Sequence, residues 1–106
     1  NITTPFISKN IKHAFHLYSL QIDFQKINIS KIDFFNKVKR KGVQLQVHYI
    51  PIHFQPYYSK KFGFKYGDFP ISENFYSKQV SIPIYPGLNL TDQEKVIKII
   101  ISSIDE

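Results

Sequence analysis

Strict alternation of apolar and polar residues over positions 43–49, VQLQVHY, is the feature that most limits how this chain can fold. Successive side chains of a strand point to opposite faces, so the pattern predicts a strand with one buried face and one polar face. The apolar face holds Val43, Leu45, Val47 and Tyr49, and the polar face holds Gln44, Gln46 and His48. The polar face is either wet or turned toward another domain or a ligand.

A helix is predicted just before this strand. Ser30 is a typical N-cap residue, and Gly42 fits the position after a helix end. Between them Ile32, Phe35 and Val38 recur at helical spacing, with Phe34 beside them. We therefore expect a helix over residues 31–41. The basic run VKRK at 38–41 lies where cations stabilise the helix dipole, so we interpret it as a helix end rather than a nucleic-acid patch.

The remaining elements are short. Residues 1–12 are polar and indicate an irregular entry segment, whereas residues 14–23, AFHLYSLQID, alternate as a strand covered on both faces for part of its length. Residues 80–84 predict a short strand, closed by prolines and therefore at an edge or in a short insert. Pro70 opens a predicted helix over residues 71–78.

A capping box, TDQE, begins at Thr91 and predicts a last helix over residues 92–103. Its expected buried side consists of Val96, Ile97, Ile100, Ile101 and Ile104. Residues 50–68 hold two prolines and two glycines, and we expect a long loop there, which in a compact domain is often functional.

Together these elements predict an α+β fold in which a small, mostly antiparallel three-stranded sheet has helices packed on one face. The first two strands are joined through one helix, which leaves open whether they are parallel neighbours or pair at a distance. The length of 106 residues fits one domain, 1–106, with a single core. No apolar run approaches the roughly 20 residues that a membrane span needs.

Composition narrows the possible partners. The net charge of +6 favours a polyanionic partner such as nucleic acid, an acidic membrane or a phosphate-bearing ligand. Cysteine is absent, which excludes disulfides and thiolate metal sites and is compatible with the cytoplasm. Methionine is absent as well, so we expect the chain to be a piece of a longer protein.

The stretch VHYIPIHFQPYY at 47–58 holds the candidate site residues. His48 and His53 are five apart across a proline, which does not suit a helical zinc pair, and we expect no metal site. No Gly-x-Ser-x-Gly turn, carboxylate pair or glycine-rich phosphate loop is present. His48 has two possible roles, a ligand contact or a structural histidine. A ligand contact is possible because both ring nitrogens can hydrogen-bond.

Two aromatic groups remain open to two interpretations. Tyr57 and Tyr58 could stack on a base or sugar, but we favour ring burial that anchors the loop on the core. The string KKFGFKYG at 60–67 interleaves aromatics with lysines, which is typical both of a nucleic-acid surface and of a glycine-spaced loop clamped by aromatics.

Two longer strings, QVHYIPIHFQPYYSKKFG and GDFPISENFYSKQVSIPIYPGL, resemble the C-terminal small domain of the DegT/StrS nucleotide-sugar aminotransferases. These are fold-type I pyridoxal-phosphate enzymes, and the resemblance covers roughly residues 12–101. Within the family the chain is most similar to transaminases of the pseudaminic acid pathway. Such enzymes transfer an amino group from glutamate to C4 of a UDP-linked 4-keto-6-deoxy-N-acetyl sugar.

The resemblance implies that a preceding large domain binds pyridoxal phosphate and carries the Schiff-base lysine. This chain would then contain no catalytic residue and would be inactive alone, its cofactor-binding residues being unassigned. His48 would face the sugar nucleotide, with Tyr49, His53 and Tyr57 lining the entrance. His16 matches a family histidine to which we assign no role.

The same resemblance implies a cytoplasmic homodimer that binds neither membrane nor nucleic acid. Two other readings stay open. One is a free-standing basic nucleic-acid-binding module, and the other is an interaction domain without a ligand.

Overall fold

The computed structural model describes residues 1–105 and contains a three-stranded antiparallel sheet in the order β1-β2-β3. The strands are β1 (Ile2–Thr3), β2 (Tyr18–Ile22) and β3 (Gln79–Ile82). Ile2 pairs with Ile22, and Leu20 pairs with Val80. The predicted α+β class with a three-stranded antiparallel sheet is confirmed. The strand predicted at 14–23 is shorter in the structure, at 18–22, and the strand predicted at 80–84 lies at 79–82. Strand β1 lies in the segment predicted to be irregular.

The strand predicted at residues 43–49 is reduced to one bridge. Gln46 and Ser81 exchange two backbone hydrogen bonds of 3.1 and 2.8 Å. The ladder stops there because the His48 backbone N–H donates to the side-chain oxygen of Gln79, at 3.0 Å, instead of to a carbonyl of β3. The alternation persists through Gln46, with Val43 and Leu45 buried and Gln44 and Gln46 exposed. It ends there: Val47 and His48 are both half-buried, and the prediction of Tyr49 on the apolar face is wrong, since Tyr49 is 71% exposed.

Helix α1 (Lys31–Arg40) begins where the cap predicts. Ser30 Oγ accepts a hydrogen bond from the Asp33 backbone N–H at 3.0 Å, and the left-handed φ of 89° at Gly42 follows the helix end. The buried face is rotated from the predicted one, since Phe34 and Val38 are buried while Ile32 is 74% exposed. The basic run lies in the last turn, as predicted.

Helix α4 (Leu90–Asp105) begins two residues earlier than predicted. Asn89, not Thr91, is the cap: its Oδ1 accepts from the Asp92 N–H and its Nδ2 donates to the Asp92 carboxylate, both at 2.8 Å. Val96 and Ile100 are buried and Ile104 is half-buried, but Ile97 and Ile101 are exposed. The predicted buried side is therefore too wide.

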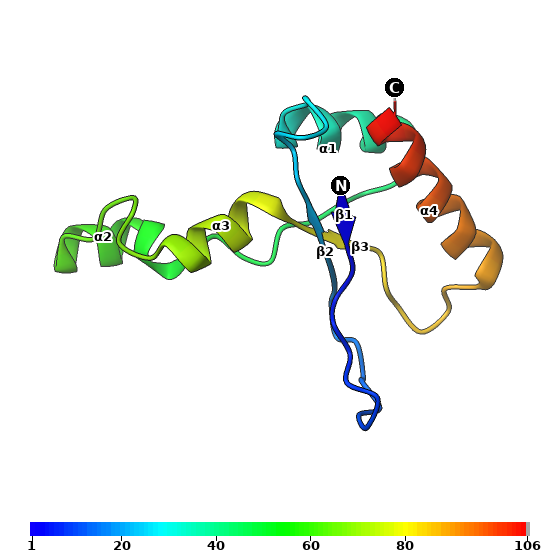
Figure 1. The fold of residues 1–106 in the computed structure, drawn as a ribbon, viewed down its shortest axis with the longest axis horizontal. Coiled ribbons are helices and arrows are strands. Elements are labelled where there is room, and N and C mark those ends of the chain that lie inside the picture. Colours follow the sequence, from blue (N-terminus) through cyan, green and yellow to red (C-terminus); the bar gives the residue numbers. More distant parts are fainter. Residues whose placement is uncertain (106) are drawn as a thin grey trace.

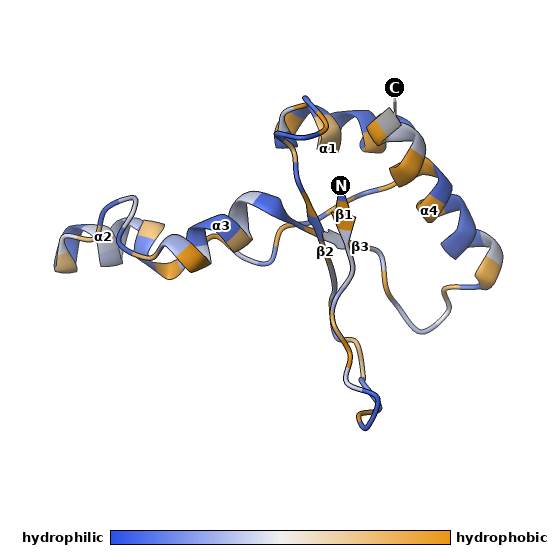
Figure 2. Cartoon of the chain, in the orientation of Figure 1, coloured by the Kyte–Doolittle hydropathy of each residue, from blue (hydrophilic) through white to orange (hydrophobic). Residues whose placement is uncertain are grey.

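The core lies between one face of the sheet and the two helices α1 and α4 (Figures 1 and 2). It consists of Leu20, Ile22, Phe34, Val38, Val43, Leu45, Val80, Val96 and Ile100. The opposite, polar face of the sheet is thereby left free of these two helices.

The long loop predicted at 50–68 is largely helical. It contains a 3-10 helix (Ile52–Phe54) and helix α2 (Pro56–Phe62), and after a short turn it leads into α3 (Pro70–Lys78). Pro56 at the first position and Gly63, with a φ of 71°, are the start and stop signals of α2. Residues 51–78, which we call the arm, project away from the sheet (Figure 1).

Among residues 1–105, no helix has the length and apolar character to cross a membrane.

Candidate functional site

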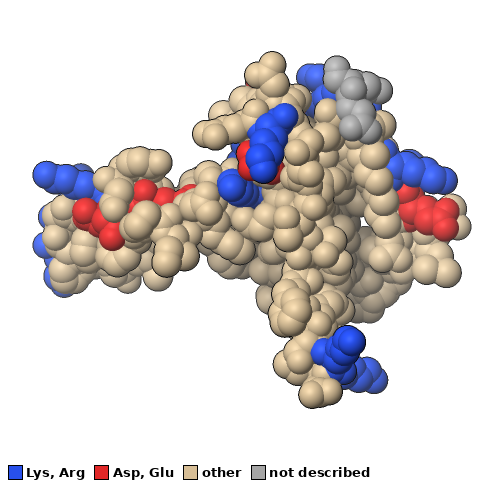
Figure 3. Space-filling view, viewed as in Figure 1, with Lys and Arg blue, Asp and Glu red and all other residues tan. Residues whose placement is uncertain are grey.

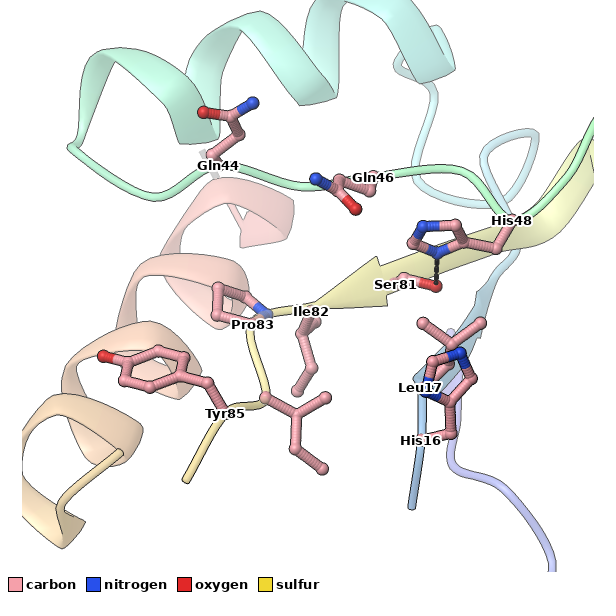
Figure 4. Close-up of a pocket in the computed structure, with 10 residues that line it drawn as sticks. His16, Leu17, Gln44, Gln46, His48, Ser81, Ile82, Pro83 and Tyr85 are labelled. Atoms are coloured by element: carbon pink, nitrogen blue, oxygen red, sulfur yellow. Dashed lines mark hydrogen bonds between the residues drawn. The ribbon is translucent and has the colours of Figure 1, made fainter. Parts of the chain in front are cut away.

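A hollow of about 360 Å³ opens on the polar face of the sheet (Figure 4). Four segments meet there: the chain entering β2, the stretch beside β3 that carries His48, β3 itself and the turn after it. The lining residues are His16, Leu17, Gln44, Gln46, His48, Ser81, Ile82, Pro83, Ile84 and Tyr85. The predicted polar row of Gln44, Gln46 and His48 therefore borders one cavity.

A buried polar cluster lies beneath His48. Gln79 and Ser81 share one face of β3, and Ser19 is the registered partner of Ser81 on β2. Gln79 is 1% exposed and Ser81 is 4% exposed. The Gln79 side-chain nitrogen donates to Ser81 Oγ at 2.7 Å and to Ser19 Oγ at 3.0 Å. Burial of these polar atoms is tolerated because each has a hydrogen-bond partner.

The His48 ring is held above this cluster. Its Nδ1 lies 2.9 Å from Ser81 Oγ, and the ring is edge-to-face with Tyr49 at 4.7 Å between centroids. The peptide bond between His48 and Tyr49 is cis. Within residues 1–105 no protein atom hydrogen-bonds to the other ring nitrogen, Nε2. The ring is half-buried and lines the hollow (Figure 4), so Nε2 is available to a ligand.

The other predicted site residues lie elsewhere. Tyr49 is next to His48 but is 71% exposed and does not line the hollow. His53 and Tyr57 both belong to the arm. His53 is 6% exposed with its Nε2 2.9 Å from the Glu73 carboxylate, and Tyr57 is 61% exposed and accepts a 2.8 Å hydrogen bond from Lys61. The structure thus brings His48 and Tyr49 together and separates both from His53 and Tyr57.

The prediction that the rings of Tyr57 and Tyr58 are buried and anchor this segment on the core is wrong. Tyr57 and Tyr58 are 61% and 40% exposed and lie edge-to-face with each other on α2. The aromatic residues of KKFGFKYG also contact one another or the arm: Phe62 stacks on Phe64, and Tyr66 stacks on Phe54. The interpretation of a glycine-spaced segment clamped by aromatics fits these contacts.

Three residues of the cluster were missed in the sequence: Ser19, Gln79 and Ser81. Two signals were available. The segments YSLQI and QVSI each alternate polar and apolar residues. Gln79 and Ser81 also lie within GDFPISENFYSKQVSIPIYPGL, the second of the two strings that resemble the aminotransferase family. His16, to which the family resemblance assigned no role, lines the same hollow as His48 (Figure 4).

The fold matches those of solved aminotransferases. Helicobacter pylori PseC, described as an aminotransferase involved in the biosynthesis of pseudoaminic acid, has a TM-score of 0.76 at 23% identity over 85% of this chain and 24% of its own. Bacillus subtilis NtdA, solved with the bound cofactor PMP, has a TM-score of 0.76 at 22% identity over 99% and 23%. The fold is therefore that of one portion of an aminotransferase.

The chain belongs to the DegT/DnrJ/EryC1/StrS aminotransferase family, whose model matches residues 1–101. An uncharacterized protein of Methanocaldococcus jannaschii is 41% identical over 95 residues, which are 90% of this chain and 24% of that protein. The spore coat polysaccharide biosynthesis protein SpsC of Bacillus subtilis is 38% identical over 98 residues, 92% of this chain and 25% of that protein. The chain thus spans about a quarter of the curated relatives' length. The family uses pyridoxal phosphate and its amine form, PMP.

The residues of the hollow do not fit the binding of this cofactor by themselves, because no lysine or arginine lines it. Burial lowers the pKa of one lysine, Lys31, to about 8. Its Nζ, however, donates to the Tyr76 carbonyl at 2.6 Å, lies over the Tyr76 ring and borders a separate hollow beside α1. Among the described residues no three His, Asp or Glu side chains gather as metal ligands.

Proposed function

We propose that the chain is the C-terminal domain, residues 1–106, of a sugar aminotransferase and that its hollow receives the sugar of a nucleotide-linked keto sugar. The observation that carries this proposal is the position of His48, whose free Nε2 borders a polar hollow in a chain of this family. The specific substrate proposed is a UDP-linked 4-keto-6-deoxy-N-acetyl sugar, aminated at C4 with glutamate as donor, as in pseudaminic acid synthesis. The two quoted sequence strings support this substrate.

The chain's own residues supply binding and orientation in this proposal. His48 and the amides of Gln44 and Gln46 offer hydrogen bonds to the sugar, and Tyr49 flanks His48 outside the hollow. Tyr57 lies on the arm, outside the hollow, so a role in shaping the entrance would require the complete enzyme. Because His53 is buried against Glu73, it would act by holding the arm in place rather than by touching the sugar. The cofactor and its lysine would belong to a separate large domain, and the complete enzyme would be a cytoplasmic homodimer.

The nucleic-acid alternative rests on the net charge of +6 and on the aromatics interleaved with lysines at residues 60–67. Membership of an aminotransferase family over residues 1–101 supports the proposed function over this alternative. On the face shown in Figure 3, lysine and arginine side chains lie in several separate groups, at the end of the arm, over the body and at the lower tip, rather than in one patch. A binding groove for a phosphate backbone requires clustered cations.

Replacing His48 by alanine in a complete aminotransferase containing this chain tests the proposal. One net hydrogen bond is worth about 1 kcal/mol, so kcat/KM for the keto sugar should fall roughly fivefold or more. The rate of amino transfer from the donor to the cofactor, measured by single-turnover absorbance, should not change. His13→Ala is the matched control, because His13 is exposed and lies outside the hollow. An unchanged kcat/KM in His48→Ala would remove His48 from the sugar site.

A further inference from the structure

We propose that Gln79 and Ser81 are positioning residues that hold His48 with its proton on Nε2, so that His48 presents an N–H donor to an acceptor oxygen in the hollow. The acceptor would be a keto, hydroxyl or phosphate oxygen. The tautomer is inferred from this chain alone. Only the identity of the acceptor as part of a sugar nucleotide rests on the proposed function.

The orientation of the Gln79 amide comes first. The backbone N–H of His48 can only donate, and it lies 3.0 Å from Gln79 Oε1. An amide turned the other way would place its NH₂ group against this N–H, leaving two donors face to face. The amide oxygen of Gln79 must therefore point toward His48, and its nitrogen toward the serines.

The two protons of the Gln79 NH₂ group are both used. One goes to Ser81 Oγ at 2.7 Å and the other to Ser19 Oγ at 3.0 Å. Each serine oxygen thus accepts one hydrogen bond from Gln79. Each serine also keeps one hydroxyl proton to donate.

The Ser81 proton has two acceptors within reach. His48 Nδ1 is 2.9 Å from Ser81 Oγ, whereas Ser19 Oγ is 3.4 Å away. The shorter distance lies in the normal range for such a bond and the longer one at its limit. Nδ1 is the better placed of the two acceptors, so the geometry favours donation from Ser81 to an unprotonated Nδ1 and a neutral ring with its proton on Nε2.

This arrangement determines which ligand groups suit His48. A carbonyl oxygen accepts a hydrogen bond from Nε2–H, as do hydroxyl and phosphate oxygens. A protonated amine can only donate and finds no acceptor on this ring. His48 is therefore matched to the oxygen of a keto substrate better than to an ammonium group at the same position.

The tautomer can be measured directly in the 106-residue chain labelled with ¹⁵N-histidine. Long-range ¹H–¹⁵N correlation spectra above the pH at which the ring is charged distinguish a protonated from an unprotonated ring nitrogen. The His48 signals are assigned by their loss in His48→Gln. We expect a single form with unprotonated Nδ1 and protonated Nε2. His16, which is exposed and makes no side-chain hydrogen bond within residues 1–105, serves as the reference for a ring that averages both forms. A His48 ring protonated on Nδ1, or averaged like His16, would overturn the proposal.

Two variants test whether Gln79 and Ser81 determine the tautomer of His48 or whether the ring adopts it by itself. Ser81→Ala removes the donor, so His48 should shift to the averaged spectrum of His16, and Ser81→Thr should restore the single form. Gln79→Glu places an acceptor against both serines, so Ser81 should donate to it and His48 should gain an Nδ1 proton. An unchanged His48 spectrum in Ser81→Ala contradicts the proposal even if Gln79→Glu does not fold.

Activity distinguishes this inference from the proposed function. In the complete aminotransferase, Ser81→Ala should raise KM for the keto sugar severalfold and leave KM for the amino donor unchanged. If the spectra show the expected tautomer but His48→Ala keeps full activity, the proposed function fails and the inference on Gln79 and Ser81 stands. If activity falls but the tautomer is reversed, the inference fails alone.

Discussion

At the scale of single residues, Glu73 makes the hydrogen bonds that join the parts of the arm. Its side chain is 5% exposed and accepts hydrogen bonds from the Gly67 N–H at 3.0 and 2.9 Å, from the Phe69 N–H at 3.2 Å and from His53 at 2.9 Å. Burial by itself would raise the pKa of Glu73, but the hydrogen bonds from Gly67, Phe69 and His53 outweigh it and lower the pKa below its ordinary value of 4.5. One ionised carboxylate thus ties the start of α3 to the turn before it and to the 3-10 helix.

This lowered pKa predicts the pH dependence of the arm's stability. A carboxylate with a folded-state pKa below its unfolded value stabilises the fold fully above about pH 4.5, and this stability is lost as the pH falls through the folded-state pKa. Glu73→Gln should therefore lower Tm at neutral pH and flatten the dependence of Tm on pH in the acid range. The measurement is thermal unfolding followed by tyrosine fluorescence, since the chain has seven tyrosines and no tryptophan.

Glu94→Gln is the matched control, because Glu94 is 69% exposed and pairs with Lys98 only at 3.9 Å. The pKa of Asp23 is also lowered, so the wild type and both variants share that part of the acid dependence. The difference between wild type and Glu73→Gln isolates Glu73. An acid slope in Glu73→Gln as steep as in the wild type would contradict the prediction.

At the scale of elements, local signals determine what the sequence could predict. The Ser30 cap and the glycine after α1 are contacts within one turn, and both were predicted correctly. The row of Gln44, Gln46 and His48 was likewise visible as alternation. The cluster of Ser19, Gln79 and Ser81 was not predicted because it forms only when β2 and β3 pair across 60 residues or more. Its position depends on strand register, which a single alternating segment does not specify.

The start of α4 gives the sharpest test at this scale, because two candidate caps lie two residues apart. The Asn89 side chain makes both capping contacts with Asp92, so Asn89→Ala should cost about 0.5–2 kcal/mol of unfolding free energy. Thr91 is exposed inside the first turn, and Thr91→Ala should change stability by no more than about 0.5 kcal/mol. Urea unfolding followed by circular dichroism measures both. A larger loss in Thr91→Ala than in Asn89→Ala would restore the sequence-based capping box.

At the scale of the whole molecule, the chain is more extended than its length requires. The radius of gyration is 15.7 Å, whereas a compact domain of about 100 residues has about 13 Å. The difference comes from the arm and from the segment between β1 and β2, which both project from the sheet (Figure 1). Large apolar side chains are exposed along the arm: Tyr57, Phe62, Tyr66, Phe69, Ile71 and Phe75. Such a surface is typical of a segment that contacts another protein surface.

The exposed arm predicts that the 106-residue chain associates with itself as its concentration rises. Ile71 is 88% exposed and borders an apolar hollow with Phe69 and Phe75, so Ile71→Ser should weaken this association without lowering Tm. Ile11→Ser is the matched control, because Ile11 is 60% exposed in the segment between β1 and β2, outside the arm. Sedimentation equilibrium over a range of concentrations measures the association constant for each chain. Equal weakening by the two substitutions would show that general surface hydrophobicity, and not the arm, drives association; a monomeric wild-type chain at all concentrations would contradict the prediction outright.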